Sequence, residues 1–301
     1  LHQEIGDILR IVVRLKNIKE ISVLCQLGVD VFCLDTAFSI KRIAHFGIPE
    51  IKKAKKEIAL QDKKIYLFVN KMIHEEDLAP LTDFLKEVAK INIDGIIIRD
   101  LTVYVIAKQL GLEGLIIYQP GTMNTDSYSA HYLDQLHIKG MTISREITMD
   151  EIMNILSRDV SLEFSLVGHG YLDMFYSKRK LLTNYFKYKG ITGKTIIDNH
   201  DFRLNEEIRH NDFYPIIEDA YGTMIFRSKK LMSYDKLKMM KNRLTDFYIE
   251  RLFLSDKEYL DTIRLYNDLM TKEYFLSKYD GFDDGFYERP TELIKCDKDE
   301  D

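Results

Sequence analysis

Short, almost continuously apolar segments alternate with helical segments along the first half of the chain, and this alternation constrains the fold most. The unit, which is an apolar strand, a polar residue and a helix, recurs at intervals of roughly 20 to 35 residues. Near-continuously apolar strands are typical of a parallel sheet with helices outside it. Seven such units precede residue 170, more than most open sheets use. We therefore predict an α/β fold, a TIM-like (β/α)8 barrel.

The later part of the chain is less regular, and we predict an excursion from the barrel after the seventh strand. The predicted barrel strands are 5–13, 29–34, 65–69, 95–99, 115–118, 140–144, 162–167 and 246–251. The predicted helices are 18–27, 49–60, 75–91, one that ends at 110, 127–136, one after a capping box at 148–151, and 258–276. The excursion is expected at about 187–245, with two short strands at 214–218 and 222–226. We expect a single domain over 1–279 and a loosely packed acidic tail over 280–301.

Polar side chains end the predicted strands, and parallel strands place equivalent ends on one face of a barrel. We expect catalytic roles for Asn70, Asp100, Arg145, Glu146 and His169, and substrate contacts for Asp35 and Gln119. For Arg145 two interpretations stay open, an anion-binding residue or a structural pair with a rim carboxylate such as Asp100. Because polar residues often simply end strands, the structural interpretation stays open for each of the others as well.

The stretch from Leu162 to Tyr188 combines a histidine with cations and aromatic rings. Two glycines flank His169, so the backbone can turn sharply and leave the imidazole at a strand end. Six Lys or Arg and no acidic residue lie between Asp173 and Asp198. We predict that Tyr176, Lys178 and Arg179 contact the substrate. A hydrogen-bonded histidine in a turn beside a solvated basic helix is the alternative.

Composition limits the class of protein. The 301 residues are 46% hydrophobic and 30% charged, which indicates a globular chain with a full core. A net charge of -5 argues against a uniformly basic nucleic-acid coat but permits a local basic patch. No apolar run approaches the roughly 20 residues of a membrane span, and no signal-peptide pattern occurs. The cysteines Cys25, Cys33 and Cys296 form no CxxC pair. We expect a cytoplasmic protein with no membrane contact.

Seven segments match those of one family in the family's order. They are GVDVFCLD followed by FSIKR, KIYLFVNKMIHEEDL, DGIIIRD, ISREITMDEI, HGYLDMFYSKRKLLTNYF, YPIIEDAYGTMIF and FYIERLFLSDKEYLDTIRLY. The chain resembles the collagenase-like, or U-thirty-two, peptidase family over almost its whole length. The resemblance implies a mostly closed barrel. The chain resembles most the short, cysteine-poor members of the family. That resemblance implies that this chain takes part in forming 5-hydroxyuridine at the tRNA wobble position, together with a longer cysteine-bearing paralogue.

Many members of this family carry a four-iron cluster on four cysteines, and the chain departs from that pattern. In the family's histidine motif, the resemblance implies a first Cys four residues after the His and a second Cys seven residues after the first. This chain has Asp173 and Lys180 at those positions, and Met232 stands near the place of a further family cysteine. Carboxylate, ammonium and thioether groups do not replace thiolates around a cluster. We expect no iron–sulfur cluster and no cofactor bound by cysteine, while a divalent metal stays open.

Three functions stay open, and the first is the one we expect. The chain is a tRNA-hydroxylation subunit that binds tRNA and a paralogue, a peptidase of the kind the family name suggests, or a non-catalytic RNA- or protein-binding scaffold. The sequence contains no HExxH and no GxSxG motif, which argues against the common peptidase classes. The carboxylates of Asp35, Asp100 and Glu146, with His169, are candidate ligands for a divalent ion in the peptidase alternative.

Overall fold

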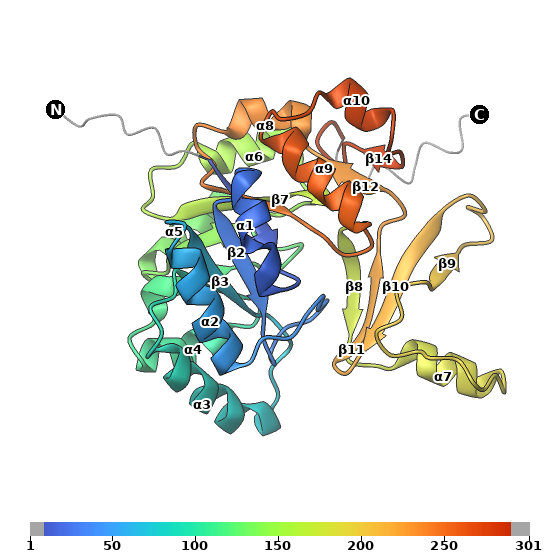
Figure 1. Ribbon diagram of the computed structural model, residues 1–301, viewed down its shortest axis with the longest axis horizontal. Coiled ribbons are helices and arrows are strands. Elements are labelled where there is room, and N and C mark those ends of the chain that lie inside the picture. The colour runs from blue at the N-terminus through green and yellow to red at the C-terminus, as the bar shows by residue number, and fades with distance from the viewer. Residues whose placement is uncertain (1–8, 290–301) are drawn as a thin grey trace.

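The computed structural model describes residues 9–289, and its centre is a closed barrel of eight parallel strands (Figure 1). The barrel closes because β13 pairs in parallel with β1 on one side and with β7 on the other. The eight strands are β1 (Arg10–Arg14), β2 (Val31–Asp35), β3 (Lys64–Val69), β4 (Gly95–Ile98), β5 (Ile116–Tyr118), β6 (Gly140–Thr142), β7 (Glu163–Gly170) and β13 (Asp246–Ile249). The predicted (β/α)8 barrel and its eighth strand are confirmed.

Helices lie outside the strands, which are buried on both faces. In α2, Ile51, Ala54 and Ile58 recur at helical spacing and are fully buried. The predicted capping box between Thr148 and Glu151 begins α6. The helices and 3₁₀ turns around the barrel are η1 (Ile18–Glu20), α1 (Ile21–Gln26), α2 (Ile48–Ala59), η2 (Glu75–Asp77), α3 (Leu78–Val88), α4 (Leu101–Gln109), η3 (Glu113–Leu115), α5 (Ser127–Gln135), α6 (Met149–Leu156), α8 (Tyr234–Met240), α9 (Asp256–Tyr266) and α10 (Lys272–Leu276).

Between β7 and β13 the chain leaves the barrel and builds a four-stranded antiparallel sheet, the insertion (residues 173–226). Its strands are, in spatial order, β8 (Asp173–Ser177), β11 (Gly222–Phe226), β10 (Phe213–Asp219) and β9 (Arg203–Asn205), and α7 (Leu181–Tyr188) follows β8. Figure 1 shows the insertion to the right of the barrel, with α7 at its lower end. The two strands predicted around a turn at 219–221 are confirmed as the β10–β11 hairpin.

The insertion begins at residue 173 rather than at about 187, because the segment after His169 forms an edge strand. In β8, Ser177 pairs with Thr223 and Phe175 with Ile225 of β11, a long-range pairing that the local sequence does not reveal. The chain also returns earlier than residue 245, since β12 (Lys230–Met232) pairs antiparallel with the end of β7.

Three other expected elements differ at their ends. The first strand begins at Arg10, and residues 5–8 of its predicted range lie outside the described residues. The predicted helix over 258–276 is two helices, because the chain turns at Asp268, whose φ is +55°. The tail predicted to be loosely packed forms β14 (Phe282–Asp283), which pairs with β12, while 290–301 lie outside the described residues. Over residues 9–289 no helix has the length and apolar character to cross a membrane.

Candidate functional site

The C-terminal ends of the barrel strands meet around one buried carboxylate, that of Asp173, which begins β8 just after β7. Arg145, after β6, donates from Nη1 to Oδ1 at 3.0 Å and from Nη2 to the backbone oxygen of Asp173. Arg99, after β4, donates from Nη2 to Oδ2 at 2.9 Å. Lys41, in the loop after β2, donates from Nζ to Oδ1 at 2.9 Å. The side chain of Asp173 thus binds cations from three separate strand ends.

The charges around Asp173 keep it ionised. Burial alone would raise the pKa of Asp173, but Arg145, Lys41 and Arg99 outweigh burial and hold that pKa well below its usual value. Hydrogen bonds between ionised groups are stronger than those between neutral groups, so Asp173 fixes the positions of all three cations.

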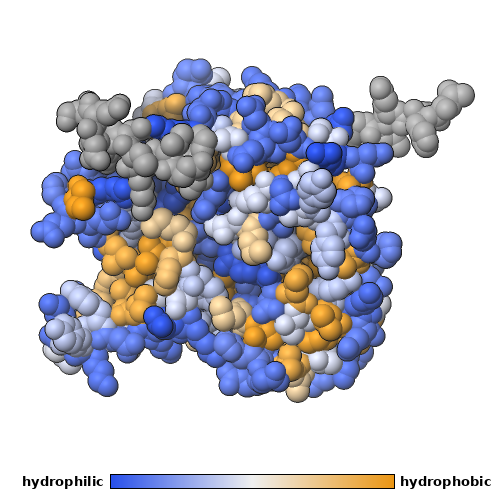
Figure 2. Space-filling view, turned by 180° about the vertical axis from the view of Figure 1, so that it is seen from behind, coloured by the Kyte–Doolittle hydropathy of each residue, from blue (hydrophilic) through white to orange (hydrophobic). Residues whose placement is uncertain are grey.

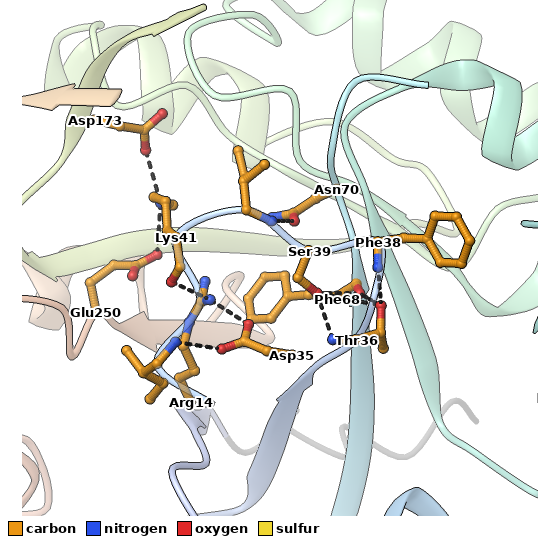
Figure 3. Close-up of polar contacts among 12 residues, drawn as sticks. Arg14, Asp35, Thr36, Phe38, Ser39, Lys41, Phe68, Asn70, Asp173 and Glu250 are labelled. Carbon is orange, nitrogen blue, oxygen red and sulfur yellow. Dashed lines mark hydrogen bonds and ion pairs between the residues drawn. The ribbon is translucent and has the colours of Figure 1, made fainter. Parts of the chain in front are cut away.

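Lys41 extends this network to Glu250, which follows β13 (Figure 3). Lys41 Nζ lies 3.3 Å from Glu250 Oε1, and the Lys41 backbone oxygen accepts from Arg14 Nη1 at 3.0 Å. Burial would raise the pKa of Glu250, but Lys41 and Arg14 lower it below its usual value. The φ of Lys41 is +55°, which non-glycine residues seldom adopt, so these contacts hold the loop in a strained conformation.

Asp35 and Asn70 support the loop that carries Lys41 rather than lining a cavity. Asp35 is fully buried, accepts from Arg14 Nη1 at 2.5 Å and accepts from the Ile43 N–H at 2.9 Å. Burial raises the pKa of Asp35 even though Arg14 opposes the shift. Asn70 Oδ1 accepts from the Ile40 N–H at 3.1 Å (Figure 3). Both predicted residues therefore lie at the strand-end face, where they position the Lys41 loop.

The insertion covers one side of the mouth, and its first strand, β8, borders a cavity. Ile40 and Leu252 at the mouth pack in one apolar cluster with Ile217, Met224 and Phe226 of the insertion sheet. Near β4 to β6 a cavity of about 170 Å³ is lined by Arg99, Pro120, Thr122, Arg145, Asp173, Met174, Phe175 and Tyr176. Of the predicted site residues, the structure brings Arg145 and Tyr176 together at this cavity.

The remaining predicted residues of the strand ends make local contacts. Arg145 does pair with a carboxylate, but the partner is Asp173 and not Asp100. Asp100 caps α4 through the Thr102 N–H at 2.9 Å and also accepts from the Ile73 N–H at 3.0 Å. Gln119 Nε2 donates to Thr142 Oγ1 at 3.2 Å. Glu146 is half-buried beside Arg145, and its backbone N–H donates to Ser144 Oγ at 3.2 Å.

The expectation that His169 lines the mouth is wrong, because its ring packs against α9, α10 and β14. It is fully buried, with Nδ1 3.2 Å from the Tyr266 hydroxyl and Nε2 3.4 Å from Thr262 Oγ1. The rings of Phe275 and Phe282 lie 6.1 and 5.5 Å away between centroids. Burial, with a smaller effect of Lys230, lowers the pKa of His169 to about 3. The neutral imidazole therefore belongs to the packing between barrel and helices.

The three residues predicted to bind substrate after His169 have different environments. The Tyr176 hydroxyl donates to the backbone oxygen of Tyr221 at 3.3 Å, which fixes the orientation of this half-buried ring. Lys178 Nζ lies 3.3 Å from Glu76 Oε1 at an exposed position. Arg179 is exposed, and its backbone oxygen accepts from Thr223 Oγ1. Of the three, Tyr176 alone lines the cavity.

Sequence reasoning missed five residues of the mouth network: Arg14, Lys41, Arg99, Asp173 and Glu250. The strand-end rule that selected Arg145 would also have selected Arg99 and Glu250, which end β4 and β13 in the same way. Lys41 lies in the FSIKR segment, but its role needs the loop conformation. Within the described residues, no group of three or more His, Cys, Asp or Glu side chains is arranged to hold a metal ion.

Two proteins named for tRNA hydroxylation are similar to this chain in sequence. The chain is 24% identical to tRNA hydroxylation protein P2 of Bacillus subtilis over 253 residues, which cover 81% of this chain and 80% of that protein. It is 27% identical to tRNA hydroxylation protein P of Escherichia coli over 210 residues, covering 56% of this chain but only 46% of that longer protein.

The solved structure of a U32 peptidase superposes on 83% of this chain and 95% of its own, with a TM-score of 0.50 at 11% identity. The model of peptidase family U32 matches residues 16–292, nearly the whole sequence. The chain therefore belongs to peptidase family U32.

Proposed function

We propose that this protein is a subunit of a tRNA wobble-uridine hydroxylation system and carries no iron–sulfur cluster of its own. The observation that carries the proposal is a charged strand-end cavity beside an insertion whose segment around α7, residues 178–194, is basic and aromatic. The names of two relatives, tRNA hydroxylation proteins P2 and P, support the same process. In the expected system, a longer cysteine-bearing paralogue is the partner.

The basic surface supports RNA binding. On and around α7 the exposed cations besides Lys178 are Arg179, Lys180, Lys187, Lys189 and Lys194. Two tyrosines on α7 are also exposed, Tyr185 at 53% and Tyr188 at 84%. In a chain of net charge -5, such a local concentration of cations favours a polyanionic partner. Exposed rings between cations stack unpaired bases, which the anticodon loop of a tRNA presents.

Two residues that were predicted to contact the substrate have partners within the protein, so we expect the RNA-binding surface to centre on α7. Lys178 already pairs with Glu76, and Tyr176 is held by its bond to Tyr221. Figure 2 shows apolar side chains gathered on one side of the insertion. Phe175 of β8 and Leu204 of β9 are exposed apolar residues of its sheet. The resulting surface offers ring and apolar contacts together with cations, as single-stranded RNA requires.

The surroundings of Asp173 support the absence of a cluster. The side chain that stands where the resemblance implies a first cysteine is already saturated by three cations. Lys180 is exposed before α7, and Met232 belongs to β12, paired with His169. Of the two described cysteines, Cys33 is buried within β2 and Cys25 lies in α1. These residues do not fit an iron–sulfur cluster, which needs thiolates around one point.

The test is a mass-spectrometric measurement of wobble-uridine hydroxylation in cells that lack the gene. We expect the modification to fall, and expect the natural sequence but not an Arg99→Gln/Arg145→Gln double variant to restore it. An exposed Lys86→Gln variant is the matched control and should restore it fully. Unchanged modification in the deletion strain, together with digestion of casein by the purified protein, would replace this proposal by the peptidase alternative.

A further inference from the structure

We propose that the cavity at the mouth binds one extruded nucleobase, and that Arg99 and Arg145 select uracil over cytosine. The inference rests on the proposed function, because it identifies the site and the side chains that recognise the tRNA base. It assigns base specificity to Arg99 and Arg145. The sequence points to Arg145 alone, and as an anion-binding or structural residue.

The size of the cavity matches a single ring. Its volume of about 170 Å³ is below the roughly 300–1,000 Å³ of pockets that enclose drug-sized ligands. Met174 and Phe175 at its edge are 46% and 41% exposed, so the cavity opens to solvent beside the insertion. Enzymes that act on a base take it out of the stack into a pocket of this kind, and a base in a loop is already unpaired.

The charges in the cavity favour a neutral polar ligand over a phosphate. Arg99 and Arg145 line the cavity, and Lys41 reaches Asp173 at its wall, but Asp173 binds all three cations and Glu250 also binds Lys41. The two carboxylates compensate most of the positive charge, so a second full anion would gain little. The positive charge that remains is suited to polarising a carbonyl oxygen, which carries only a partial negative charge.

The hydrogen-bonding groups favour uracil. Within the described residues, bonds to Asp173 use one N–H of Arg99 and two of Arg145, and a guanidinium has further donors but no acceptor. Uracil presents the acceptor O4 where cytosine presents an amino donor, as thymine and cytosine do in DNA. Where the group at C4 faces the two guanidinium groups, cytosine would therefore place donor against donor and leave these donors unpaired. Phe175 and Tyr176 line the same cavity and supply ring contacts to the base.

The loop after β5 supports this arrangement. A Cβ on Gly121 would lie 2.7 Å from Arg99 Nη2 and 3.4 Å from Arg145 Nη2, and the residue has a φ of +98°. Only glycine lets the backbone approach the two guanidinium groups this closely without strain. Asp173 is thus the positioning residue that holds both donors, and Gly121 leaves the space that they occupy.

The experiment measures binding of the full chain to two fluorescently labelled RNA hairpins that differ only by U or C at one loop position. We expect the natural protein to prefer the U hairpin by about tenfold, as one well-placed hydrogen-bonding pair provides. Arg99→Gln should reduce the preference below about twofold, because an amide can turn to accept from cytosine. Lys187→Gln, which removes one positive charge from α7, should weaken both hairpins equally and keep the preference.

Melting curves of each variant establish that it is folded, and Arg99→Lys serves as a second variant that keeps the charge but loses the planar fork. Its preference should fall as well. If the natural protein binds both hairpins equally, or if Arg99→Gln keeps the preference, the base-pocket inference is overturned while the RNA-binding role stands. If the protein binds neither hairpin, both proposals fail.

Discussion

Replacing Asp173 by Asn should destabilise the protein by about 3–5 kcal/mol at neutral pH, the usual cost of removing one partner from a buried ion pair. The substitution removes the negative charge that faces Lys41, Arg99 and Arg145 in a site where Asp173 is only 3% exposed. The loss is not three times larger, because Lys41 keeps Glu250 and Arg145 keeps the backbone oxygen of residue 173. For a domain of this size the melting temperature should fall by on the order of 10 °C.

The same effect should depend on pH in a defined direction. The pKa of Asp173 is lowered in the folded state, so the carboxylate contributes stability above its unfolded pKa of about 3.9. That contribution is lost as the pH falls through the lower folded value. The difference in unfolding free energy between the natural protein and Asp173→Asn should therefore be constant between about pH 5 and about pH 8, and it should shrink below about pH 4.

Urea unfolding followed by circular dichroism at several pH values measures this difference. Asp159→Asn, which removes an exposed carboxylate, is the control and should change stability by less than about 0.5 kcal/mol. A double-mutant cycle with Arg145→Met isolates the Asp173–Arg145 coupling. A loss below about 1 kcal/mol at pH 7, or a loss that persists unchanged at pH 3, would refute the conclusion that Asp173 anchors the mouth.

Three further predictions concern the histidine, the RNA surface and the cofactor. The pKa of His169 is lowered to about 3, so folding favours its neutral form. Stability should therefore decline as the pH falls below about 6.5, where the unfolded imidazole gains a proton. In urea titrations His169→Gln should flatten that decline, and the variant should bind tRNA within about twofold of the natural protein. A double variant, Lys187→Ala with Lys189→Ala, should weaken tRNA binding and reduce the log–log salt slope by about one to two units in filter binding, whereas Tyr188→Ala should cost roughly 1–3 kcal/mol with little change of slope. If both variants bind tRNA as well as the natural protein, α7 does not contact RNA. Protein purified without oxygen should contain no stoichiometric iron and show no visible absorbance band, because Asp173, Lys180 and Met232 stand where the family resemblance implies thiolates. Iron analysis checks this directly.

The barrel could be predicted because its signal is local. Each strand is a short segment buried on both faces, so near-continuous apolar residues identify it without knowledge of its neighbours, as β2 and β3 illustrate. Strand-end polarity then placed Arg145 correctly, since parallel strands finish on the same face. The β10–β11 hairpin was predictable for the same reason, because its turn is encoded within a few residues.

The direction of side chains and the partners of charges depend on contacts distant in sequence. His169 ends the same strand that leads to Asp173, yet its ring packs on Tyr266 of α9 while Asp173 meets Arg99 and Arg145 from β4 and β6. Those partners lie 97, 74 and 28 residues away along the chain, so no local pattern distinguishes the packed histidine from the buried carboxylate. The sequence determines which residues reach the strand ends, and three-dimensional packing determines which of them share one cavity.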